Sequence, residues 1–161
     1  MPDLAWWLQH FERSAFRLEC LPAYSVPQEA AMLAAFRRGE TVELPADHPW
    51  IMRVREKCGN GRTMERVRVV SSPLTDYERF ELSLYPHSRA AGENIRVVER
   101  GSVEVTEDFW LFDDTIAVVL RYDAAGHYLG VDVTSDIVRF RRQREVVLAR
   151  SITLEEFQAR H

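Results

Sequence analysis

The sequence predicts a single α/β domain of the α+β type, in which a mixed, largely antiparallel sheet is flanked by helices. Its length of 161 residues is that of one domain. Hydrophobic residues make up 46% of the chain and charged residues 29%, as in globular proteins. Helical and strand-like spacings of apolar residues alternate from end to end, without a linker or an internal repeat. We therefore expect one domain over residues 1–161.

Helices and strands are expected to alternate in the first part of the chain. Apolar residues at helical spacing predict a helix over residues 3–13, with Asp3 as its N-cap. Alternation of apolar and polar residues then predicts a strand over 15–21. A second helix is expected over 27–39, and a short third one begins with Asp47 as its N-cap.

The middle of the chain predicts two interior strands on either side of a helix. The strands are expected over 62–70 and 94–99, where β-branched residues are frequent. The helix begins near Thr75, and Pro86 must kink or restart it before Gly92 ends it. Six residues of the predicted strands are expected to be buried in one sheet: Val67, Val69, Ile95, Val97, Leu111 and Val119.

Three more strands and two helices are expected in the last third of the chain. The strands cover 109–112, 115–122 and 127–133, and the last two are joined as a hairpin, so this part of the sheet should be antiparallel. A long helix is expected to start with Ser135 as its N-cap. A capping box at Thr153 predicts a final short helix.

Composition also indicates the cellular setting. No window approaches the ~18 consecutive apolar residues of a membrane span, and we expect no signal peptide. Cys20 and Cys58 are expected to be reduced thiols, as is usual for a cytoplasmic protein. The net charge of −4 provides no global positive field, so direct nucleic-acid binding is not expected.

The most unusual stretch is the pair Asp113 and Asp114, which follows four large apolar residues at 109–112. Two carboxylates at the end of a strand could hold a hard cation or supply a base. However, adjacent strand residues point to opposite faces, and Asp-Asp before Thr115 is also typical of a β-turn. The pair is therefore either a turn or a site.

An arginine-rich helix is the second candidate. Arg139, Arg141 and Arg142 lie close together with Arg144 and could grip phosphates or an acidic partner. They also spread around the helix, as expected for a solvated face with salt bridges. The five histidines show no metal-ligand spacing, and the chain has no Walker loop, dinucleotide fingerprint or nucleophile elbow. We expect neither a metal nor a cofactor.

Five stretches together carry a resemblance to a known family: FERSAFRLE at 11–19, RVRVV at 66–70, PLTDYERFE at 73–81, AGENIR at 91–96 and DFWLFDD at 108–114. With them, the chain resembles an uncharacterised actinobacterial domain family over essentially every element. The resemblance implies no activity. It does imply a setting, because members are often encoded beside Xre-type helix-turn-helix regulators and small acidic partner proteins.

Residues 66–150 are also similar to one half of a phospholipase D-like fold. The His-x-Lys pattern of that superfamily is absent, because the sole lysine, Lys57, has no histidine two residues before it. This similarity implies a shared fold without the shared chemistry.

These features favour a non-enzymatic regulatory or partner-binding protein, associated with a helix-turn-helix regulator system and using the arginine-rich helix. One alternative is a phosphodiesterase or nuclease-like toxin, in which four residues converge on a phosphate and a metal: Asp113, Asp114, Glu81 and Arg96. A second alternative is a small-molecule sensor with an aromatic pocket built from Trp110, Tyr77 and Tyr85.

Overall fold

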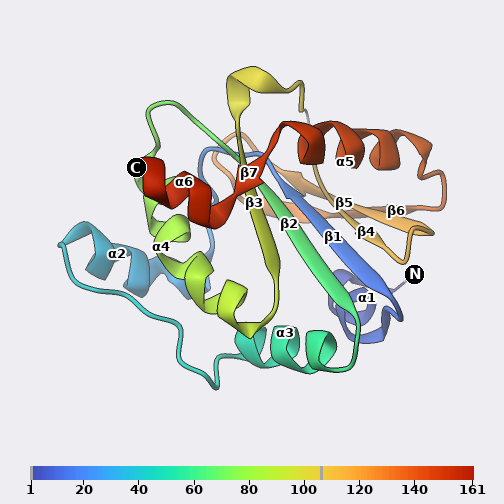
Figure 1. The fold of residues 1–161 in the computed structure, drawn as a ribbon, viewed down its shortest axis with the longest axis horizontal. Helices are drawn as coiled ribbons and strands as arrows, with labels where there is room; N and C mark the ends of the chain where they lie inside the picture. Colours follow the sequence, from blue (N-terminus) through green and yellow to red (C-terminus); the bar gives the residue numbers. More distant parts are fainter. Residues whose placement is uncertain (1, 106) are drawn as a thin grey trace.

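A computed structural model describes residues 2–105 and 107–161 of the chain. Within these ranges, seven strands form one mixed sheet, and helices cover both of its faces (Figure 1). The strands are β1 (Ser14–Glu19), β2 (Thr63–Val70), β3 (Asn94–Glu99), β4 (Asp108–Phe112), β5 (Ile116–Tyr122), β6 (Tyr128–Thr134) and β7 (Ile152–Thr153). The helices are α1 (Leu4–His10), α2 (Ala30–Arg37), α3 (Pro49–Gly59), α4 (Asp76–Ala91), α5 (Val138–Arg150) and α6 (Leu154–Arg160), with short 3₁₀ helices η1 (Pro27–Glu29) and η2 (Arg100–Ser102). The predicted α+β fold with a mixed sheet is confirmed.

The sheet has a parallel centre and an antiparallel side. Its strands follow the order β6-β5-β4-β1-β2-β3-β7. β1, β2 and β3 are parallel neighbours, and the connections between them contain α3 and α4. β4, β5 and β6 continue from β1 as antiparallel neighbours, as predicted for this part of the chain. Among the described residues, no helix has both the length and the apolar character needed to cross a membrane.

Each face of the sheet packs on a different set of helices. On one face, apolar residues of the central strands, among them Phe16 and Leu18, form a core with Phe140 and Val147 of α5. On the opposite face, α1 and α3 pack against β4 and β5, while α4 and α6 pack against β2 and β3. The six predicted core residues all lie in strands of this sheet and are all buried, so that prediction is confirmed.

Two predicted N-caps are wrong by one or two residues. The first turn of α3 is capped by His48, whose Nδ1 accepts a hydrogen bond from the amide of Trp50, and Asp47 lies one residue too early. Ser135 does not cap α5, which starts at Val138 after Ile137. The amide of Asp136 donates to Oγ1 of Thr134 instead, which keeps this segment in a turn.

Helix α4 continues through Pro86, although we expected a kink or a restart there. A proline has no amide hydrogen for the carbonyl four residues earlier, which is that of Leu82. The side chain of Gln158 on α6 donates to this carbonyl at 3.3 Å and so replaces the missing bond. A residue 72 positions later in the chain therefore compensates for the proline.

The core packing leads to a first prediction, for the variant Val69→Asp. Val69 in β2 is fully buried, with 0% of its surface exposed, so an aspartate there would be a buried charge without a partner. We expect loss of cooperative folding, because such a charge costs several kcal/mol against a total stability of about 5 to 15 kcal/mol. The matched control is Val138→Asp on α5, where the valine is 64% exposed. Thermal unfolding followed by circular dichroism tests this, and a wild-type melting curve for Val69→Asp would contradict it.

Candidate functional site

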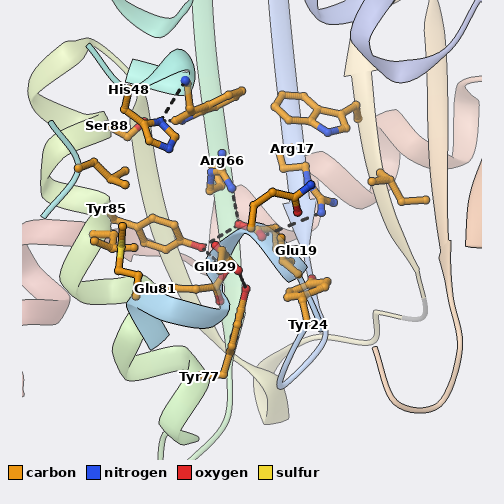
Figure 2. A pocket seen from close by; sticks show the side chains of 18 of the residues that line it. Arg17, Glu19, Tyr24, Glu29, His48, Arg66, Tyr77, Glu81, Tyr85 and Ser88 are labelled. Carbon is orange, nitrogen blue, oxygen red and sulfur yellow. Dashed lines mark hydrogen bonds and ion pairs between the residues drawn. The ribbon is translucent and has the colours of Figure 1, made fainter. Parts of the chain in front are cut away.

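A pocket of about 500 Å³ lies on the sheet face opposite α5 (Figure 2). Its floor comes from β1, β2 and β4, and α4 forms one wall. The segment around η1 and α2 and the loop before α3 contribute the rim, with Val26, Gln28, Met32, Leu44 and His48. Aromatic and charged side chains share the lining, a mixture typical of ligand sites.

The floor is charged because the central strands place polar residues on this face. Successive strand residues point to opposite sides, so Phe16 and Leu18 face α5 while Arg17 and Glu19 face the pocket. In the neighbouring β2, Val67 and Val69 face α5, and Arg66 lies on the pocket side beside Arg17. Helices cover these side chains, so the polar face of the strands is buried.

Arg66 is the centre of the polar network. Its Nη1 donates to Glu19 at 2.6 Å, and its Nε donates to Glu93 at 2.6 Å. Its guanidinium also lies 5.4 Å from the ring centre of Trp50 and 5.5 Å from that of Tyr85. The hydroxyl of Tyr85 donates to Glu19 at 2.7 Å. Arg66 thus joins β1, α3, α4 and the residue before β3.

Asp108 organises the network at its other end. Its carboxylate accepts hydrogen bonds from Nη2 of Arg17 at 3.1 Å and from the amide of Cys20 at 3.0 Å. The hydroxyl of Tyr24 also donates to Asp108. The guanidinium of Arg17 lies 5.9 Å from the ring centre of Trp110. Both pocket arginines are therefore held between carboxylates and an indole ring.

A further buried ion pair joins Arg68 and Glu81, with 2.7 Å between Nη2 and Oε1. Arg68 is fully buried, with 0% of its surface exposed. Burial raises the pKa of Glu81 to about 8 and outweighs the opposing charge of Arg68, and the negative charge of Glu19 raises it further. The pKa of Glu81 is therefore raised above its usual range although the group contacts Arg68.

The pKa values of two other carboxyl groups in the lining are shifted in opposite directions. Burial alone would raise the pKa of Glu19, but the charges of Arg66, Arg17 and Arg68 together hold it well below its usual range. For Glu29 on η1, burial raises the pKa more than the hydrogen bond from the Tyr77 hydroxyl, at 2.5 Å, lowers it. The pocket thus holds one carboxyl group whose pKa is lowered beside two whose pKa values are raised.

Several predicted site residues meet in this pocket. Trp110, Tyr77 and Tyr85, predicted as one aromatic pocket, all line it, together with Glu81. Figure 2 shows Tyr77 and Tyr85 on α4 directed toward the charged floor. Trp50 adds a second indole, whose Nε1 donates to Ser88 at 3.0 Å.

The structure does not bring Asp113, Asp114 and Arg96 to Glu81. Asp113 and Asp114 form the turn between β4 and β5, both with φ of 55°, and their left-handed backbone suits aspartate. The Asp113 carboxylate accepts hydrogen bonds from the amides of residues 12–14, which lower its pKa despite the effect of burial. Asp114 pairs with Arg144, and Arg96 donates to Ser151. The pair is a structural turn.

The arginines of α5 lie on the far side of the sheet from the pocket. Arg139 pairs with Glu107, and Arg141 and Arg142 are exposed. Neither of these two has an ion pair with another described residue. This surface remains separate from the pocket.

Sequence reasoning missed most of the floor and part of the rim. Arg17, Glu19, Arg66, Glu29 and Tyr24 were not predicted as site residues. The signal was present in the alternation of β1 and β2, whose polar positions carry large charged residues. A polar strand face normally indicates solvent, and only the position of α4 in the fold shows that helices cover it.

The raised pKa of Glu81 leads to a second prediction, for the variant Glu81→Gln. The folded protein holds this proton more tightly than the unfolded chain, where the pKa is near its usual value of 4.5. The resulting stability is complete at low pH and is lost as the pH rises from about 4.5 to about 8. The glutamine variant lacks this loss. The difference in free energy of unfolding between the variant and the wild type should therefore shift in favour of the variant by about 1 kcal/mol or more between pH 5 and pH 8.

Urea unfolding at several pH values measures this difference, and the exposed Glu56→Gln serves as the control. A difference between wild type and Glu81→Gln that stays constant with pH would contradict the assignment.

A protein-family model matches almost the whole chain. Residues 2–159 match the family model described as a domain of unknown function, DUF6879. No curated protein matches the chain. Among the described residues, no group of three or more His, Cys, Asp or Glu side chains could hold a metal ion. From the length of the match, the chain belongs to the DUF6879 family.

Proposed function

We propose that the protein is a regulatory, small-molecule-binding protein whose ligand occupies the pocket on the β1 and β2 face. The observation that carries this is a cavity of about 500 Å³ directly above a buried polar network. Buried ion pairs rarely increase stability over an apolar core of the same shape. Their presence beside a cavity is therefore better explained by recognition of a ligand than by a contribution to the stability of the fold.

The tyrosines support binding rather than chemistry. Burial raises the pKa of Tyr24, Tyr77 and Tyr85, so their hydroxyl groups stay protonated. Each of them donates a hydrogen bond to a carboxylate. The Ser88 hydroxyl likewise donates to Glu93 at 2.6 Å. Three of these four acceptors, Glu19, Glu93 and Asp108, also pair with arginines, so the hydroxyl groups are held in place as hydrogen-bond donors within a fixed network.

A ligand screen with a variant at the rim tests the proposal. Trp50 and Trp110 line the pocket, so ligand binding should change their fluorescence and raise the melting temperature. Met32→Trp places a larger side chain at the rim, and we expect it to weaken binding at least about tenfold because the ligand loses volume. The matched control is Met52→Trp on α3, where the methionine is 54% exposed and outside the lining. Equal binding by both variants would place the ligand elsewhere.

A second candidate function, binding of an acidic protein partner such as a component of a helix-turn-helix regulator system, is favoured by the surface of α5. Val138, Arg142 and Val146 follow one another at intervals of four residues on one side of this helix, and all are exposed. Arg141 lies beside them. Exposed guanidinium groups without an ion-pair partner are typical of protein contact surfaces, and two exposed valines lie beside them here.

Charge reversal tests this surface. We expect Arg141→Glu with Arg142→Glu to leave the melting temperature unchanged and to abolish capture of an acidic partner from host extract. The wild-type interaction should weaken as salt shortens the Debye length from about 10 to about 3 Å. The control is the double reversal of Arg37 and Arg38, which are also exposed. Equal yields from both double variants would show that α5 is a solvated face.

A further inference from the structure

The polar network around the pocket holds more acidic than basic groups. Three guanidinium groups take part, from Arg17, Arg66 and Arg68. Five carboxyl groups line the pocket or contact its lining: Glu19, Glu29, Glu81, Glu93 and Asp108. Each guanidinium already has a carboxylate partner, so the excess is acidic.

Three carboxyl groups facing the cavity retain unused acceptor capacity. Oε1 of Glu19 accepts bonds from Arg66 and Tyr85, whereas its Oε2 lies 4.0 Å from the nearest guanidinium nitrogen. The hydrogen bond to Glu29 from Tyr77 reaches only Oε1. Oε2 of Glu81 has a single long contact of 3.4 Å with the Tyr85 hydroxyl. Figure 2 shows these three glutamates, from β1, η1 and α4, directed toward one region.

Aromatic rings surround this region. Tyr24 and Tyr77 have ring centres 5.9 Å apart, and Tyr24 and Tyr122 have ring centres 5.1 Å apart. Their phenol groups line the pocket together with Tyr85 and two indoles. Faces of such rings attract cations, and their edges provide apolar area. Carboxylates beside aromatic rings are a combination that recognises a cationic head on an apolar body.

We propose that the pocket binds an organic ammonium cation, with its nitrogen held by Glu19, Glu29 and Glu81 and its apolar part packed on the aromatic rings. This assignment rests on the proposed small-molecule function and adds the class of ligand. An anion would fit poorly, because both pocket arginines are already engaged by carboxylates and stacked on indoles.

Cation binding should release protons from the pocket. The groups that face Glu81 are Arg68 from β2, Glu19 from β1, Tyr85 from α4 and Glu29 from η1. Burial raises the pKa of Glu81 to about 8 and also raises that of Glu29. A bound cation stabilises the ionised form of each group, so affinity should rise with pH from about 6 to about 8.5.

Three probes that share a phenylethyl body test the proposal by titration calorimetry: 2-phenylethylammonium, neutral 2-phenylethanol and anionic 3-phenylpropanoate. We expect the ammonium probe to bind at least about tenfold more tightly than the other two probes. A charge-assisted hydrogen bond to a carboxylate is stronger than a neutral one, and the anionic probe would be repelled. Its binding should release protons, seen as a heat that depends on the ionisation enthalpy of the buffer.

Glu29→Gln keeps the shape of a half-buried residue at the rim and removes its charge. We expect this variant to weaken ammonium binding about tenfold and to leave the alcohol unaffected. The control is Glu43→Gln, an exposed residue of the loop before α3 that lies outside the lining.

The outcomes separate the two proposals. Equal or tighter binding of the alcohol or the propanoate, or ammonium binding unchanged in Glu29→Gln, overturns the cation assignment and leaves the small-molecule function standing. If no probe binds but the screen finds ligands sensitive to Met32→Trp, only the cation assignment fails. If neither probes nor screened ligands bind, both proposals are wrong.

Discussion

The bridge that Arg66 makes between Glu19 and Glu93 is the interaction on which the rest of the structure depends. One guanidinium ties β1 to the start of β3 and packs against Trp50 of α3 and Tyr85 of α4. Removing it would leave two buried carboxylates without their main partner, which is far more costly than replacing the whole cluster with apolar residues. Arg66 therefore both holds α3 and α4 against this face of the sheet and contributes to the charge of the pocket floor.

Much of the fold could be predicted from the sequence because local patterns determine it. The run of β-branched residues in β2 and the N-cap Thr153 of α6 each require only neighbouring residues. β7 was missed because two residues carry no periodicity, and its pairing of Thr153 with Arg96 exists only in the folded chain. Continuity of α4 through Pro86 likewise depends on Gln158, far along the chain.

The site was less predictable than the fold because most of its contacts join residues that are far apart in the sequence. Tyr77, Tyr85 and Trp110 could be grouped because large aromatic residues are distinctive in sequence. Arg17 and Glu19 look like solvent-facing positions of an ordinary strand, and they are buried by residues distant in the sequence, among them Asp108 and Tyr85. The Asp113 and Asp114 pair is conspicuous in sequence, yet its carboxylates anchor the chain before β1 and pair with Arg144.

The floor and the rim of the pocket belong to parts of the molecule with different mechanical roles. Floor residues such as Arg17 and Arg66 lie in central strands that are paired on both sides. A substitution at one of these positions would therefore affect several neighbouring strands. Rim residues such as Met32 and Leu44 lie outside the sheet, on α2 and the loop that follows it. A substitution at the rim can therefore change the shape or the charge of the cavity without disturbing the strand pairing beneath it.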